Sequence, residues 1–259
     1  MRVTRTVPGA WVTGAATRFH YRVAGPADAS AVPVVLVHGL GVSSAYFARL
    51  QPLLAAERRV YAVDLPGFGR TRPRPHHTLK GGALAASLHE WMIALGLTRV
   101  HLIGHSLGGP VAVEFAHRYP ECVAALVLIS PTIGTRGPRT PYLSWGLLRD
   151  FLREPPSLFP VLVPDYVRAG IRRIIATDAV MDDEDTVGIL ATIHAPVLII
   201  RGERDPIVSR ENIHTLHDAA PLVHYHEIAG APHVVQWREA PQVAAHITAF
   251  LAAIDAPHG

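Results

Sequence analysis

The sequence predicts an α/β protein with a mostly parallel central sheet flanked by helices. Short β-branched runs alternate along the chain with helical patterns, and Gly-containing turns separate the two. Most of the runs are apolar at consecutive positions, which is typical of parallel strands covered by helices on both faces. Strands that alternate with helices also favour right-handed crossovers between parallel neighbours.

The elements follow one another in a regular order. The opening segment predicts an antiparallel hairpin over Val3–Val7 and Thr17–Val23. Six further strands are predicted at Val34–His38, Val60–Val63, Val100–Gly104, Ala124–Ile129, Pro196–Arg201 and Val223–Ile228. Helices are predicted at Ser44–Leu54, Leu79–Leu95, Leu107–Tyr119, Ser209–Ala219 and Pro241–Ile254.

One stretch interrupts this alternation. Between Pro131 and His194 no run has the quality of the other strands, and prolines and aromatic residues are frequent. Structureless connections longer than about 15 residues are uncommon, so we expect a small helical insertion over the sheet. The predicted division is a core domain of residues 1–130 and 195–259 and a helical cap of residues 131–194.

Composition limits the classes of function. Of the 259 residues 49% are hydrophobic and 17% charged, as in an ordinary globular protein. The formal net charge of +3 is too small to favour nucleic acid or an anionic membrane as a partner. Cys122 is the only cysteine, and no apolar run approaches the roughly 20 residues of a membrane span or forms a signal peptide. We expect a cytoplasmic protein that acts on a small-molecule substrate, and a homodimer is left open.

The segment Gly104-His105-Ser106-Leu107-Gly108 lies between a predicted strand and a predicted helix. This G-x-S-x-G pattern forms the nucleophile elbow of α/β-hydrolases, in which glycines two residues before and after the serine avoid collisions in a tight turn. The pattern alone is frequent by chance, and a serine N-cap would also explain it. Its place between strand and helix favours Ser106 as a nucleophile, with the Leu107 N–H suited to a developing oxyanion.

A serine hydroxyl needs an adjacent base that a third group orients. Asp205 follows the predicted strand Pro196–Arg201, and His233 follows Val223–Ile228. Carboxyl ends of parallel strands meet at one sheet edge, and the chain order serine, acid, histidine is that of this elbow type. We therefore predict Asp205 as the acid and His233 as the base.

Other residues compete for these roles. Glu203 is the rival acid, although Asp205 is better placed because it leads directly into Pro206 and the next helix. His105 is expected to be structural, through a hydrogen bond beneath the turn. A histidine metal site is an alternative with loose spacing and no surrounding Cys or carboxylate, and we predict no metal. Its ligands would be His214, His217, His224 and His226.

The predicted strand Val34–His38 ends in a Gly39-containing turn. A backbone N–H from this turn would complete an oxyanion hole, and Leu40 is the candidate donor. A glycine turn with a structural histidine is the alternative explanation for His38, but it leaves the role of Leu40 open.

The sequence resembles the α/β-hydrolase superfamily over nearly its whole length. The matching pieces are His38-Gly39, Asp64–Thr71, Gly104–Gly109, Gly202–Val208 and Pro232-His233. The resemblance implies a sheet of about eight strands with a cap after the sixth, and a structural role for the Asp64 loop. Within the superfamily the chain is similar to the compact branch of bacterial esterases, carbon–carbon bond hydrolases and cofactor-free haloperoxidase-like esterases. A serine at the elbow argues against haloalkane dehalogenases and epoxide hydrolases, which use aspartate there.

The predicted function is hydrolysis of a carboxylic ester or related acyl bond of a small, largely apolar substrate through an acyl-enzyme, without a cofactor. Candidate pocket residues are Trp145, Phe159, Tyr166 and Trp237, although the same aromatics would also pack the cap.

Several alternatives stay open. The first is a carbon–carbon bond hydrolase of a ring-fission-type diketone, with Arg172 or Arg173 binding a carboxylate. A non-hydrolytic lyase or cyclase and a ligand-binding receptor with a slow triad are the others. Among the arginines of the loop at residues 70–74, a solvated basic surface is favoured over contact with an anionic substrate.

Overall fold

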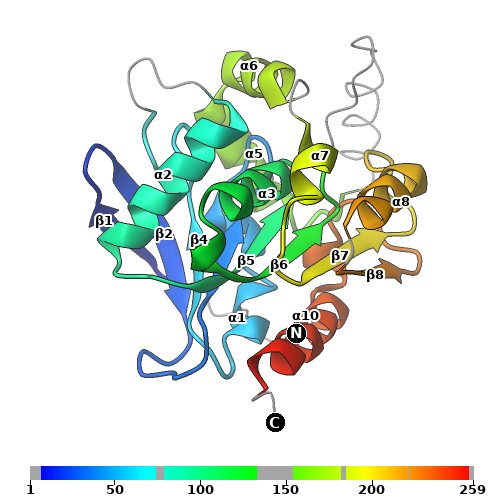
Figure 1. The fold of residues 1–259 in the computed structure, drawn as a ribbon. Coiled ribbons are helices and arrows are strands. Elements are labelled where there is room, and N and C mark those ends of the chain that lie inside the picture. The colour runs from blue at the N-terminus through cyan, green and yellow to red at the C-terminus, as the bar shows by residue number, and fades with distance from the viewer. Residues whose placement is uncertain (1–6, 74–78, 133–153, 182–184, 221, 257–259) are drawn as a thin grey trace.

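Eight strands form one sheet in the order β1-β2-β4-β3-β5-β6-β7-β8 (Figure 1). The computed structural model describes residues 7–73, 79–132, 154–181, 185–220 and 222–256. The strands are β1 Gly9–Thr13, β2 Arg18–Ala24, β3 Val34–Val37, β4 Val60–Val63, β5 Val100–His105, β6 Val123–Ile129, β7 Val197–Gly202 and β8 Val223–Ile228. β2 runs antiparallel to β1 and β4, and all other neighbours are parallel. The predicted α/β fold class is confirmed.

The helical elements connect these strands. They are η1 Ser44–Phe47, α1 Gln51–Leu54, α2 Gly81–Ala94, α3 Gly108–Arg118, η2 Pro120–Cys122, α5 Phe159–Ala169, α6 Ile171–Met181, α7 Thr186–Leu190, α8 Arg210–Ala219, α9 Val235–Arg238 and α10 Ala240–Asp255. Among the described residues, no helix combines the length and apolar character that a membrane span needs.

Two apolar layers sandwich the sheet because side chains alternate between its faces. On β3, Val35 and Val37 join the cluster that α2, α3, α7 and α8 cover, whereas Val34 and Leu36 join the cluster on the side of α1 and α10. Figure 1 shows these helix groups on opposite faces. Each large side chain buried fully in such a layer contributes roughly 1.5–3 kcal/mol.

Helices α5 and α6 lie over the carboxyl edge of the parallel strands, at the top of Figure 1. A third apolar cluster links α5 to η1 and α9, and its buried members are Val42, Tyr46, Leu158, Leu162, Val234 and Trp237. The described residues of helix α7 do not join this third cluster. Its Leu190 belongs to the first cluster, which also contains Val197 of β7. The division into a core and a cap of residues 131–194 stays a prediction.

Most predicted elements agree with the structure, since the six strands after the hairpin match within one residue at either end. The first arm of the hairpin was predicted at Val3–Val7, but Gly9–Thr13 is the strand that pairs with β2. Residues 3–6 lie outside the described residues, and Val7 is not in a strand. Pro8 has no N–H for a strand ladder, whereas Trp11 and Val12 favour one.

The predicted helix Ser44–Leu54 is also wrong in part. The structure divides it into η1, a 3-10 turn, and the short helix α1. Pro52 has no backbone N–H to donate to the carbonyl of Ala48, so one continuous helix cannot pass through it. It instead occupies the first turn of α1, where a helix tolerates proline.

Candidate active site

Ser106 occupies a tight turn between β5 and α3. Its φ of 54° lies in the left-handed region, which a residue other than glycine rarely adopts without support from its surroundings. The Ser106 N–H donates to the Ile129 carbonyl at 2.9 Å, and the Ser106 carbonyl accepts from the Gly109 N–H at 2.8 Å. All other residues from 100 to 116 are buried, while Ser106 is partly exposed. The turn therefore presents this one side chain to the outside.

Two glycines make the turn sterically allowed. A Cβ on Gly104 would lie 2.2 Å from the Gly108 carbonyl oxygen, and a Cβ on Gly108 would lie 2.3 Å from the Val37 carbonyl oxygen. The predicted collisions are thus real, and the second of them is with β3. Glycine at 108 lets the start of α3 pack directly on that neighbouring strand.

Asp205 and His233 meet beyond the ends of β7 and β8. His233 Nδ1 and Asp205 Oδ2 are 2.9 Å apart, and both side chains are buried. Asp205 Oδ1 accepts the N–H groups of Ile207 and Val208, each at 2.9 Å. Burial acts to raise the pKa of Asp205, but His233 and these hydrogen bonds outweigh it and lower the pKa overall. Because an ionised carboxylate only accepts, His233 donates from Nδ1 and Nε2 becomes its basic nitrogen.

The two loops that carry these residues are joined through the backbone. A Cβ on Gly202 would lie 2.3 Å from the Pro232 carbonyl oxygen, so glycine permits their close approach. The Arg204 N–H donates to the Ala231 carbonyl at 2.9 Å. The distance between acid and base is therefore fixed by main-chain contacts as well as by their own hydrogen bond.

Glu203, the rival acid, has a different partner. Its Oε2 accepts the Gly230 N–H at 2.7 Å, and its side chain is exposed. Asp205, rather than Glu203, is the carboxylate that contacts His233.

His105 lies beneath the turn, as the sequence suggested for a structural residue. Its Nε2 donates to the carbonyl of His233 at 3.2 Å, and the centroids of the two imidazole rings are 5.0 Å apart. Burial and, to a smaller extent, the nearby His233 lower the pKa of His105 to about 3. His105 is therefore neutral, and it holds the loop of His233 beside Ser106.

The loop after β3 also approaches the serine. A Cβ on Gly39 would lie 3.1 Å from the Ser106 Cβ. The backbone N–H groups of Leu40 and Leu107 have no hydrogen-bond partner among the described residues. Two backbone N–H groups left without a protein partner near a nucleophile suit a developing oxyanion. Both remain the predicted oxyanion donors.

Asp64 connects the loops after β3 and β4. Its carboxylate contacts His20 Nδ1 at 2.8 Å and accepts the N–H groups of Ser44 at 2.7 Å and Arg70 at 2.8 Å. Burial acts to raise the pKa of Asp64, but these hydrogen bonds lower it overall. The contacts agree with the structural role that the resemblance implied for this loop.

Asp165 of α5 is a buried carboxylate that the sequence analysis missed. The Ser43 hydroxyl donates to its Oδ2 at 2.5 Å, and Arg168 Nη1 lies 3.1 Å from its Oδ1. Burial raises the pKa of Asp165 despite these two partners. One signal was available, because Leu162, Asp165 and Ala169 share the buried face of α5.

The predicted pocket residues lie in different surroundings. Trp145 falls outside the described residues. Phe159 begins α5 and packs against the third cluster. Tyr166 covers the loop after β3, since a Cβ on Gly41 would lie 2.5 Å from its Cε1.

Trp237 is 5% exposed and lies within the third cluster. Its Nε1 donates to the Ser157 hydroxyl at 3.2 Å, and the Arg49 guanidinium lies over its ring, 4.7 Å from the centroid. These contacts join α9 to the segment just before α5 and to the segment between η1 and α1. Substrate contact by any of the four aromatics stays a prediction.

The four histidines of the alternative metal site face separate partners. His214 lies beside Tyr225, His217 beside Asp218, His224 beside Phe250 and His226 beside His246. Within the described part of the chain, no group of three or more His, Cys, Asp or Glu side chains is arranged to hold a metal ion.

A family model described as alpha/beta hydrolase fold matches residues 32–179, from before β3 into α6. The chain belongs to the alpha/beta hydrolase fold family. Membership supports a hydrolase activity and confirms the resemblance inferred from the sequence.

Relatives of this family member include a 2-hydroxy-6-oxononadienedioate/2-hydroxy-6-oxononatrienedioate hydrolase of Pseudomonas putida. That protein is 30% identical over 253 residues, which cover 86% of this chain and 87% of the relative. An esterase of Thermogutta terrifontis has a similar structure, with a TM-score of 0.82, 21% identity and coverage of 96% of this chain and 100% of that one. A meta-cleavage product hydrolase of Pseudomonas fluorescens gives a TM-score of 0.81, 22% identity and coverage of 95% and 98%.

Proposed function

We propose that this alpha/beta hydrolase is a serine hydrolase in which Ser106 is the nucleophile, His233 the base and Asp205 the acid. The buried 2.9 Å hydrogen bond between Asp205 and His233 carries the proposal. Further support comes from His105, which precedes Ser106 and contacts the carbonyl of His233. The base thus belongs to a loop that lies against the strained serine turn.

The chemistry follows from these roles. His233 Nε2 takes the hydroxyl proton as Ser106 Oγ attacks the substrate carbonyl, and Asp205 stabilises the imidazolium that forms. The N–H groups of Leu40 and Leu107 stabilise the oxyanion, each by about 3–4 kcal/mol in the transition state. His233 then protonates the leaving alcohol and activates a water molecule that releases the acid from Ser106.

The substrate we propose is a carboxylic ester of a small, largely apolar molecule. Support comes from Tyr166, whose ring covers Gly41 beside the proposed donor Leu40. An aromatic wall so close to the oxyanion loop favours an apolar group next to the reacting carbonyl. The proposed mechanism uses no metal or organic cofactor.

The test is the Ser106→Ala variant with p-nitrophenyl acetate and a fluorophosphonate label. We expect turnover to fall by at least about 10⁴-fold and labelling to disappear. Ser130→Ala is a matched control, since Ser130 also ends a strand, is buried and has a positive φ of 42°. Both variants replace a serine in left-handed backbone, so a shared loss would reflect folding. Undiminished turnover in Ser106→Ala alone would refute the proposal.

A carbon–carbon bond hydrolase is the second candidate. The Pseudomonas putida relative, named as a hydrolase of a nonadienedioate and a nonatrienedioate, favours it because the similarity covers 86% of this chain. Arg173 is a candidate for binding the carboxylate of such a substrate. In the structure its Nη1 donates to the Gly67 carbonyl at 2.6 Å. Initial rates on short acyl esters and on a dienoic ring-fission product separate the candidates, because the preferred substrate should react faster.

A ligand-binding receptor and a lyase or cyclase would each give a different result in this assay. A receptor would bind ligand without repeated turnover, whereas a lyase or cyclase would consume neither substrate by hydrolysis. Multiple turnovers of the ester per Ser106 would count against both.

A further inference from the structure

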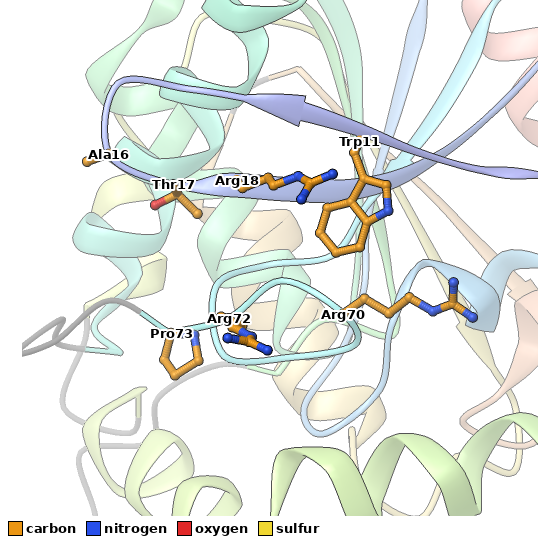
Figure 2. Close-up of a pocket in the computed structure, with 7 residues that line it drawn as sticks. All are labelled: Trp11, Ala16, Thr17, Arg18, Arg70, Arg72 and Pro73. Carbon is orange, nitrogen blue, oxygen red and sulfur yellow. The ribbon is translucent and has the colours of Figure 1, made fainter.

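A cavity of about 560 Å³ lies between the β1–β2 hairpin and the loop that follows β4 (Figure 2). It is lined by Trp11, Ala16, Thr17, Arg18, Arg70, Arg72 and Pro73. Figure 2 shows Trp11 and Arg18 on the hairpin side and Arg72 and Pro73 on the loop opposite. Its volume is within the range of small-molecule sites, roughly 300–1,000 Å³.

The cavity is separate from the proposed catalytic serine. Antiparallel pairing of Tyr21 with Val63 brings the start of β2 beside the end of β4. From β2 the sheet continues through β4 and β3 to β5, which carries Ser106. At about 4.8 Å per strand, these three steps separate the cavity from the serine by roughly 14 Å along the same sheet edge.

Positive charge is concentrated in this cavity. Arg18, Arg70 and Arg72 are all exposed, and within the described residues no carboxylate pairs with their guanidinium groups. Other arginines do have carboxylate partners, namely Arg58, Arg118, Arg168, Arg201, Arg210 and Arg238.

Two carboxylates near the cavity are engaged by other groups. Asp64 accepts the backbone N–H of Arg70 at 2.8 Å and also contacts His20. Glu90 Oε1 accepts the N–H groups of Ala16 at 2.7 Å and Thr17 at 3.0 Å, which fixes the hairpin turn. These acids therefore shape the cavity walls.

Trp11 holds one of the cations in place. The Arg18 guanidinium lies over the indole ring, 4.8 Å from the centroid, and Trp11 is 44% exposed. A cation–π contact of this kind orders the guanidinium while its N–H groups remain available for an anion. The indole also gives the site a fluorescent reporter.

We propose that this cavity binds a small polyanion whose charged oxygens belong to phosphate or carboxylate groups. Guanidinium groups bind the oxygens of both classes with paired hydrogen bonds. Like charges that line one cavity disfavour each other, and a bound polyanion would offset that effect. The cavity's limited volume and the small net charge of the chain favour a small molecule over a nucleic acid.

The test measures binding of inorganic pyrophosphate by calorimetry and tryptophan fluorescence at low ionic strength, where charge interactions are least screened. We expect Arg18→Gln, Arg70→Gln and Arg72→Gln each to weaken binding about tenfold, and the triple variant to bind undetectably. Arg99→Gln is the control, because Arg99 is exposed directly before β5, at the opposite edge of the sheet. It should bind like the wild type.

Two further variants locate the bound anion. Trp11→Phe should retain binding but lose the fluorescence change, and Ser106→Ala should bind pyrophosphate as tightly as the wild type. The proposal is overturned if the triple arginine variant binds normally, if Arg99→Gln weakens binding as much as the cavity variants do, or if Ser106→Ala abolishes binding. The test is independent of esterase activity, so it can fail or succeed separately from the proposed function.

Discussion

The carboxylate of Asp205 determines which nitrogen of His233 carries the proton. Oδ1 is used by the N–H groups of Ile207 and Val208, which leaves Oδ2 to face the imidazole. With its pKa held below the ordinary value, Asp205 stays ionised at neutral pH and keeps the proton on Nδ1. The basic lone pair of His233 is then on Nε2, which is the nitrogen that the proposed mechanism uses.

We therefore expect Asp205→Asn to lower kcat by about 10⁴-fold with little change in KM. The amide oxygen can still accept the two N–H groups, so its NH₂ would face His233 and favour the tautomer with hydrogen on Nε2. Steady-state kinetics on p-nitrophenyl acetate measures the effect. Glu203→Gln is the control and should keep near-normal activity. Equal losses in both variants would contradict the assignment of the acid.

Part of this site could be predicted from sequence because its residues follow strands. Ser106, Asp205 and His233 were each found as polar residues in a turn that follows a strand, namely the buried strands β5 and β7 and the half-exposed strand β8. The partners of His105 and Asp165 could not be predicted, since their contacts span 128 and 122 positions. Such pairs depend on how whole elements pack, and local pattern carries no information about them.

At the scale of elements, α5 is tied to the loop after β3 by one buried polar pair. The Ser43 hydroxyl meets the Asp165 carboxylate at 2.5 Å, and Asp165 is 3% exposed. A buried carboxylate that loses a hydrogen-bond donor costs free energy, because water cannot replace that donor. This pair therefore sets how α5 sits above the proposed oxyanion loop.

We expect Ser43→Ala to lower the free energy of unfolding by about 1–3 kcal/mol. Asp165→Asn should also destabilise the protein, but adding it to Ser43→Ala should cost less than the sum of the two single changes. Urea unfolding of the wild type, the two single variants and the double variant gives the coupling free energy between the two side chains. Additivity within about 0.5 kcal/mol would show that the two residues do not act as a pair.

Element boundaries were predictable where both faces of a strand are buried. β3, β5, β6 and β7 are buried along their whole length, and each was predicted from its apolar run. The two edge strands, β1 and β8, both alternate between exposed and partly buried residues; β1 was misplaced, whereas β8 was predicted at its observed bounds. The helix Ser44–Leu54 was predicted from its apolar pattern alone, without allowing for the backbone N–H that Pro52 lacks.

For the whole molecule, buried histidines make stability depend on pH. Burial lowers the pKa of His38, His101 and His105, the last to about 3. A histidine whose pKa is lower in the folded state than in the unfolded state binds its proton on unfolding. Its contribution is complete above the unfolded pKa of about 6.5 and is lost as pH falls toward the folded pKa.

We therefore expect the free energy of unfolding to fall as pH is lowered from about 6.5 to 4.5. Each such histidine contributes at most about 1.4 kcal/mol per pH unit in this window. His105→Gln should reduce the slope by up to that amount, since glutamine keeps a donor for the His233 carbonyl but does not titrate. Urea unfolding across the pH series measures it. His217→Gln is the control, because His217 is exposed on the surface of α8. An unchanged slope in His105→Gln would contradict the prediction.

The order of strands along the chain has a consequence for synthesis. The turn with Ser106 is complete once β6 has been made, because the Ile129 carbonyl of β6 accepts the Ser106 N–H, but β7 and β8, with the loops that bring Asp205 and His233, come from the last quarter of the chain. A nascent chain that has left the ribosome only up to α7 would carry the serine without its proposed acid and base. On the proposed mechanism the enzyme is thus inert until the last quarter of its chain has been made and has folded onto the sheet.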